Sequence, residues 1–204
     1  MAKFQGGLLP TVALSDAFAM MGYLFAASYA FHEGFHLACC GFCLVALAAG
    51  FGVLRFGLSE SLFAAPHEAM AAAAAFVGLP CVGLYFFPWP ALHSMSAGLL
   101  PLMNDSLHAP LVISFACVEA ATRGTTPAVR ELSKILMNLV LFVVPVIHHT
   151  YSHQNWEGLG AILLFTVAGL NTDKHKTLFG MRMVNWFHYI IGATAPTIAM
   201  ALNS

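Results

Sequence analysis

Apolar residues run in long stretches along the whole chain, and short polar segments separate them. A membrane-spanning helix needs about 20 mainly apolar residues. The pattern therefore predicts an all-α fold, a polytopic integral membrane helical bundle of about seven transmembrane helices that forms one domain over residues 1–204. Counts of about six and eight spans stay open, because one stretch is ambiguous. The expected spans are residues 8–31, 37–56, 64–87, 91–122, 132–148, 159–170 and 184–202.

The ambiguous stretch is the fourth, residues 91–122, which is too long for one straight span and is interrupted by Pro101 and Pro110. It crosses the membrane either once, as a broken helix, or twice, as two short helices. Irregular backbone at membrane depth is tolerated only where protein or a water-filled cavity covers it, and broken helices often mark transporter sites. The break therefore predicts a polar cavity, and the alternative is a kink that binds no ligand. The polar residues of this break are Asn104, Asp105, Ser106 and His108.

The basic residues distinguish between one crossing and two. Cytoplasmic loops carry an excess of Lys and Arg. If residues 91–122 cross once, all eight Lys and Arg residues fall on one side of the membrane. If they cross twice, Lys3 and Arg55 lie opposite the others. We therefore expect one crossing, a cytoplasmic N-terminus, and a C-terminus outside the cell or in a lumen. The sequence does not indicate which cellular membrane holds the protein.

Composition supports the membrane assignment and excludes other classes of protein. The 204 residues are 59% hydrophobic and 8% charged, whereas about a quarter of a soluble domain is charged. The net charge is −1 and no basic cluster is present, which excludes a nucleic-acid partner. Membrane lipid is the expected partner. The alanines at 71–75 predict close helix packing, and small-residue faces of this kind offer a contact for a homo- or hetero-oligomer.

Histidine is unexpectedly frequent, with ten residues in an otherwise apolar chain. Two H-x-x-x-H motifs fall at the expected outer end, and this spacing places both imidazoles on one helix face. Such a pair suits zinc, with Glu33 as a carboxylate ligand or a base. A haem held by His32 or His36 together with His148 or His149 is a second option. The alternative is that these histidines are half-solvated interfacial residues that bind nothing. The candidate metal ligands are His32, His36, His149 and His153, with His148 as a further possibility.

Ionisable residues within the apolar stretches form a second group of candidates. A charge at bilayer depth costs about 2.5–3.5 kcal/mol on insertion scales, so these residues usually face the bundle interior and have a partner. Asp16 is the clearest case, because only Ser15 is polar near it. It is a candidate proton relay, ligand contact, metal ligand or catalytic group, or it makes a buried hydrogen bond to another helix. The other cavity candidates are His108, Glu119 and His188, of which His188 could equally be interfacial.

Ser15–Asp16 and the His149/His153 pair match a known membrane family in residue type. A small seven-helix protein with Ser, Asp and His in its core resembles the superfamily of alkaline ceramidases and adiponectin-type receptors. The resemblance implies an intramembrane zinc amide hydrolase, with three His ligands and nearby Asp and Ser. The superfamily has an H-x-x-x-H on its last helix, where this chain has only His188, and its S-x-x-x-H has no counterpart here at a comparable place.

Two classes of function follow from these patterns. The first is a non-enzymatic membrane protein with a polar intramembrane cavity: a small transporter, a lipid or sterol binder, or an accessory subunit. The second is a zinc-dependent intramembrane hydrolase that acts on a lipid, in which the metal would lower the pKa of its bound water. Asp16 and Glu33 are the catalytic candidates for that alternative. We favour the first class, because small polytopic proteins without a clear motif are more often carriers or accessory subunits.

Overall fold

The computed structural model describes residues 9–87, 108–170 and 176–204, and in residues 108–112 the backbone alone. These parts are almost entirely helical, which confirms the all-α class, and a short antiparallel hairpin is the exception. The first half contains α1 (Pro10–His32), α2 (His36–Gly57), α3 (Glu60–Ala73), η1 (Ala74–Gly78), α4 (Leu79–Gly83) and η2 (Leu84–Phe86). The second half contains α6 (His108–Arg123), α7 (Pro127–Asn138), η5 (Leu139–Val143), α8 (Val144–Ser152), α9 (Trp156–Leu170), β1 (Thr177–Leu178), β2 (Met181–Arg182), α10 (Met183–Met200) and η6 (Ala201–Asn203).

Four helical stretches are long and apolar enough to cross a membrane, as expected of an integral membrane protein. They are Pro10–His32, His36–Gly57, Glu60–Phe86 and Pro127–Ser152. This finding does not fit the expected bundle of seven spans. Among the described residues, α6 and α9 have 16 and 15 residues, fewer than the roughly 20 that a straight span needs. Most of the expected break, including Asn104 and Asp105, lies outside the described residues.

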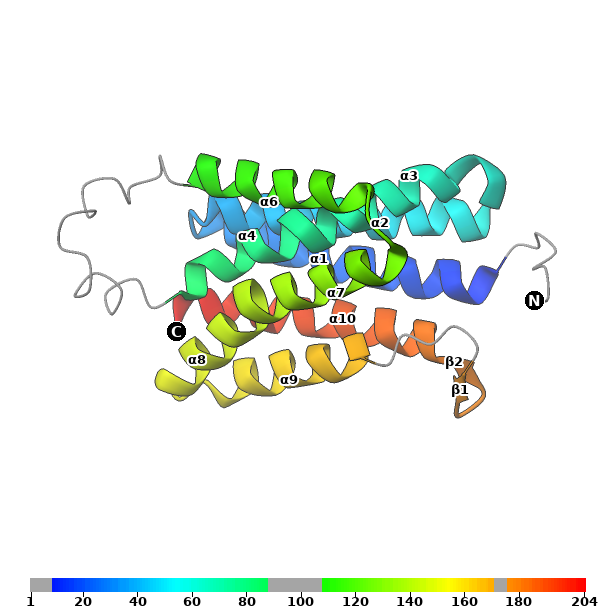
Figure 1. Cartoon of the computed structure of the whole chain (residues 1–204). Coiled ribbons are helices and arrows are strands. Elements are labelled where there is room, and N and C mark those ends of the chain that lie inside the picture. Colours follow the sequence, from blue (N-terminus) through cyan, green and yellow to red (C-terminus); the bar gives the residue numbers. More distant parts are fainter. Residues whose placement is uncertain (1–8, 88–107, 171–175) are drawn as a thin grey trace.

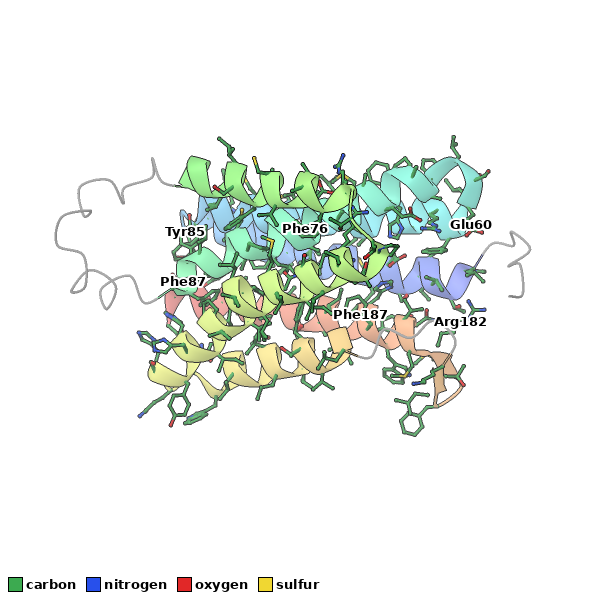
Figure 2. All side chains as sticks on the ribbon, viewed as in Figure 1. Glu60, Phe76, Tyr85, Phe87, Arg182 and Phe187 are labelled. Carbon is green, nitrogen blue, oxygen red and sulfur yellow. The ribbon has the colours of Figure 1, made fainter. Side chains whose placement is uncertain are left out.

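The helices lie lengthwise beside one another, and the chain runs back and forth between the two ends of the bundle (Figure 1). Glu60 and Arg182 lie at the end where α1 begins, the N-terminal end of the bundle, and Phe87 lies at the opposite end (Figure 2). α1 packs between α2 and α10, and α9 packs on α8 and α10. α1 and α10 run in the same direction, because Gly22 meets Gly192 in the middle of both helices and Tyr29 accepts a hydrogen bond from Asn203 farther along.

Close backbone approach through glycine holds these helices together. A Cβ atom on Gly22 would overlap the carbonyl group of Gly192, and a Cβ on Gly41 would lie 2.5 Å from the carbonyl oxygen of Gly78. Lipid offers no hydrophobic driving force between helices, so association depends on such tight van der Waals packing. The small residues therefore determine which helix faces are in contact.

Two prolines inside long helices follow widened turns. Pro80 comes after η1 and Pro145 after η5, both π-helical segments. Proline has no N–H to donate, so Pro145 leaves the carbonyl of Leu141 without its usual helical partner. A Cβ atom on Gly83 would overlap that same carbonyl oxygen, which shows how closely α4 approaches this point. The irregular turn and the glycine contact thus occur together where α4 and η5 cross.

Replacing Gly22 by Leu should separate α1 from α10 and lower the free energy of unfolding by at least about 1–3 kcal/mol, because the backbone must shift to admit the side chain. Thermal unfolding of the purified protein in detergent measures this change. Gly160→Leu in α9 is the matched control, because a Cβ atom there has nothing within 4 Å. Equal midpoints for the two variants would contradict the proposed packing.

Candidate functional site

A buried carboxylate and an imidazole meet in the interior of the bundle. Asp16 on α1 is 2% exposed, and its Oδ1 atom lies 2.7 Å from Nδ1 of His188 on α10. The structure thus places two of the cavity candidates in direct contact, and it gives His188 a buried partner. A contact this short is typical of a charge-assisted hydrogen bond, which gives Asp16 the partner that lipid cannot supply.

Ser15 joins the pair on the same side of the imidazole. Its hydroxyl donates to the carbonyl oxygen of Val12 at 2.8 Å and lies 3.3 Å from Nδ1 of His188. In a Ser-His-Asp triad the carboxylate holds one ring nitrogen and the serine lies at the other. Here Ser15 and Asp16 share one nitrogen, so the arrangement does not activate Ser15 as a nucleophile.

The other ring nitrogen of His188 and one oxygen of Asp16 have no hydrogen-bond partner among the described residues. A carboxylate at Nδ1 favours the tautomer with the proton on that nitrogen, which leaves Nε2 as an acceptor. Oδ2 of Asp16 is buried and has no hydrogen-bond partner among the described residues. A Cβ atom on Gly52 of α2 would overlap this oxygen. A buried unsatisfied acceptor is unfavourable, so a water molecule or a ligand that donated a hydrogen bond to it would stabilise the site.

Asp16 and His188 line a pocket of about 180 Å³ that is otherwise mostly apolar. Alanines of α3 and η1 form one wall, and Tyr23, Phe165 and Phe187 add aromatic surface. The small side chains leave the space open, so the alanine-rich stretch contributes a cavity wall as well as packing. The alanines that line the pocket in this stretch are Ala71, Ala74 and Ala75.

His67 on α3 lines the same pocket and belongs to a polar cluster at its edge. Nη1 of Arg55 lies 3.2 Å from Nδ1 of His67 and 3.3 Å from Oε1 of Glu68, while Nη2 of Arg55 lies 3.6 Å from Glu60. Sequence reasoning did not include His67 among the site candidates. The signal was a His-Glu dipeptide inside an alanine-rich helix, and only the fold relates it to Asp16.

The histidines of the expected outer end form two separate local groups. The His149 and His153 rings stack with centroids 4.2 Å apart, and Ser204 lies 3.3 Å from Nε2 of His149. His32 and His36 both pack against the Phe31 ring. Glu33 and His148 are exposed. Within the described ranges, no group of three or more His, Cys, Asp or Glu side chains is arranged to hold a metal ion, so the metal site stays a prediction without structural support.

Glu119 does not line the Asp16–His188 pocket and instead pairs with two arginines. Both of its carboxylate oxygens accept hydrogen bonds from Nε of Arg123 at 2.9 Å, and Nη2 of Arg130 binds Oε1 at 3.1 Å. These contacts join the end of α6 to the start of α7. His108 begins α6, and the structure describes only its backbone.

Comparisons with protein-family models, with curated proteins and with solved structures gave no match for this chain. The geometry of the pocket therefore carries the functional conclusion.

Replacing Gly52 by Ala should push the Asp16 carboxylate away from α2 and lower the free energy of unfolding by about 1–3 kcal/mol. The same change in an Asp16→Ala background should have little effect, because the obstructing oxygen is gone. Thermal unfolding of the two single variants and the double variant measures this coupling, which neighbouring residues show and distant ones do not.

Gly50→Ala is the control for that cycle, because its added Cβ would meet only the flexible Met20 side chain, 3.3 Å from the sulfur. Additive effects of Gly52→Ala and Asp16→Ala would show that the carboxylate does not lie against Gly52.

Proposed function

We propose that this protein is a ligand-binding membrane protein of the carrier or lipid-binding class, with the Asp16–His188 pair as the polar anchor of its binding pocket. The observation that carries the proposal is a buried Asp16–His188 contact on the wall of an apolar cavity. Ligand pockets are typically apolar concavities with a few well-placed polar groups. An ionisable residue inside a membrane bundle is likewise a common mark of a ligand or proton pathway.

The zinc-dependent hydrolase is the second candidate, and one observation favours it. Ser15, Asp16 and His188 come together, which are the residue types that the ceramidase-like resemblance implies. A catalytic zinc site, however, normally has three protein ligands. The described residues offer no such group, and Ser15 does not lie at the free nitrogen of His188. A binding role requires only the acceptors that the pocket already provides.

We also propose that the N-terminal end of the bundle faces the cytoplasm and that the helices beyond the four long spans complete an odd number of crossings. Two facts support this orientation: Arg55 pairs with Glu60, and Glu60 and Arg182 lie at the N-terminal end (Figure 2). Cytoplasmic ends of membrane proteins are enriched in such basic residues.

Native mass spectrometry of the protein purified in mild detergent should detect a bound ligand on the wild type that is lost in Asp16→Asn and His188→Gln. Asp16→Asn removes the carboxylate charge and His188→Gln removes the imidazole, so each breaks the charge-assisted contact, which typically weakens binding about tenfold or more. Ser28→Ala, at an exposed position of the same helix, should retain the ligand. Identical spectra for the wild type and both pocket variants would rule out the pair as the anchor.

The orientation can be measured with single cysteines in a background whose five native cysteines are replaced by alanine. An impermeant maleimide should label Ser61→Cys and Thr125→Cys from the cytoplasmic side and Gln154→Cys from the other side. Labelling of Ser61→Cys and Thr125→Cys from opposite sides would refute the proposed topology.

A further inference from the structure

A second cavity of about 330 Å³ opens between α7 and α9. α9 packs closely on α8, while α7, the preceding part of the same long helix, diverges from α9 (Figure 1). α7 buries none of its residues, and Ile135 and Leu139, which line the cavity from α7 and η5, are 53% and 42% exposed. In a membrane these apolar side chains contact lipid, so the cavity lies where a molecule dissolved in the bilayer would meet the protein.

This cavity adjoins the Asp16–His188 pocket. Ala75, Leu79, Phe165 and Phe187 line both spaces. Phe187 is labelled near the centre of the bundle in Figure 2. The two spaces therefore lie on either side of the same four residues, two of which are aromatic.

The polar groups of the α7–α9 cavity carry no net charge. Nζ of Lys134 lies 2.6 Å from Oε1 of Glu131, so these two charges neutralise each other. Nδ2 of Asn138 donates to the carbonyl oxygen of Lys134 at 3.0 Å, which assigns the amide orientation, and the buried Oδ1 has no partner among the described residues. Oδ2 of Asp16, which lies beside Gly52 next to the adjoining pocket, is a second buried acceptor without a partner among the described residues. An occupant that satisfies both must donate hydrogen bonds.

We propose that the α7–α9 cavity is a lateral portal through which an uncharged single-chain lipid with free hydroxyl groups, of the monoacylglycerol type, reaches the Asp16–His188 pocket. The proposal rests on the proposed binding function and adds its ligand class and its route. Hydroxyl groups can donate first to Asn138 and then to the acceptors of the pair, and the acyl chain fits the apolar lining. A fatty acid has a headgroup of the same charge as Asp16. The ammonium group of a fatty amine would be desolvated without a free counter-ion, because Glu131 pairs with Lys134 and Asp16 contacts His188.

Gly169 allows the portal to be blocked without disturbing the helix. It lines the cavity, and a Cβ atom there has nothing within 4 Å, so a leucine would extend into open space. Gly160 on the same helix is equally unobstructed but does not line the cavity. Gly169→Leu and Gly160→Leu thus form a matched pair with the same change of composition.

The test measures equilibrium binding of tritiated monooleoylglycerol to the full chain in phosphatidylcholine nanodiscs. We expect saturable binding to the wild type, loss of about tenfold or more in affinity for Gly169→Leu and for Asn138→Leu, and no change for Gly160→Leu. Unlabelled monooleoylglycerol should compete, while oleic acid and oleylamine should compete at least tenfold less well.

The outcomes separate the portal from the binding function. Binding that is lost in Asp16→Asn but retained in both Gly169→Leu and Asn138→Leu would overturn the portal and leave the binding function standing. Binding that is lost in Gly169→Leu but unchanged in Asp16→Asn and His188→Gln would remove the pair as the anchor. Equal competition by oleic acid or oleylamine, or no saturable binding to the wild type, would overturn the proposed ligand class.

Discussion

A carboxylate inside an apolar bundle needs a partner that lipid cannot provide, and the contact between Asp16 and His188 meets this need. It brings the first described helix onto α10 and places two ionisable groups on the wall of a cavity. Breaking a buried pair of this kind by removing one partner is strongly unfavourable, because the remaining group stays desolvated. The Asp16–His188 contact therefore both stabilises the packing of α1 on α10 and supplies the polar groups of the pocket.

Packing in this protein uses small residues for two different purposes. Glycines such as Gly22, Gly41 and Gly83 allow backbones to touch, which holds the helices in register. The alanines of α3 and η1, by contrast, leave space where larger side chains would fill the pocket. In both cases the side chains are small. Where the neighbouring helix lies close, the result is a backbone contact, and where it lies farther away, the result is a cavity.

Hydropathy alone predicted most helix positions well, because burial in lipid requires long apolar runs. Residues 37–56 were expected where α2 spans His36–Gly57. The start of α7 was missed by several residues, since its first turns are amphipathic and carry Glu131 and Lys134 among apolar residues. The β1–β2 hairpin was not expected, because its strands have two residues each.

The candidate site was harder to predict than the helices. Asp16 and His188 were each identified as unusual intramembrane residues, but no local pattern relates two helices so far apart in the chain. Spacing along one helix instead drew attention to the H-x-x-x-H motifs, and their histidines pack locally within their own segments. Composition could indicate that polar groups must find partners, whereas the identity of each partner depends on tertiary packing.

The distance along the chain between the two halves of the site has a consequence for biosynthesis. His188 follows Ser15 by 173 residues, which a ribosome takes roughly 9–35 s to add. During that interval the helix that carries Asp16 is already made, while its imidazole partner is not. The nascent protein must shelter or neutralise this carboxylate until α10 is inserted, so completion of the bundle is coupled to the arrival of one late helix.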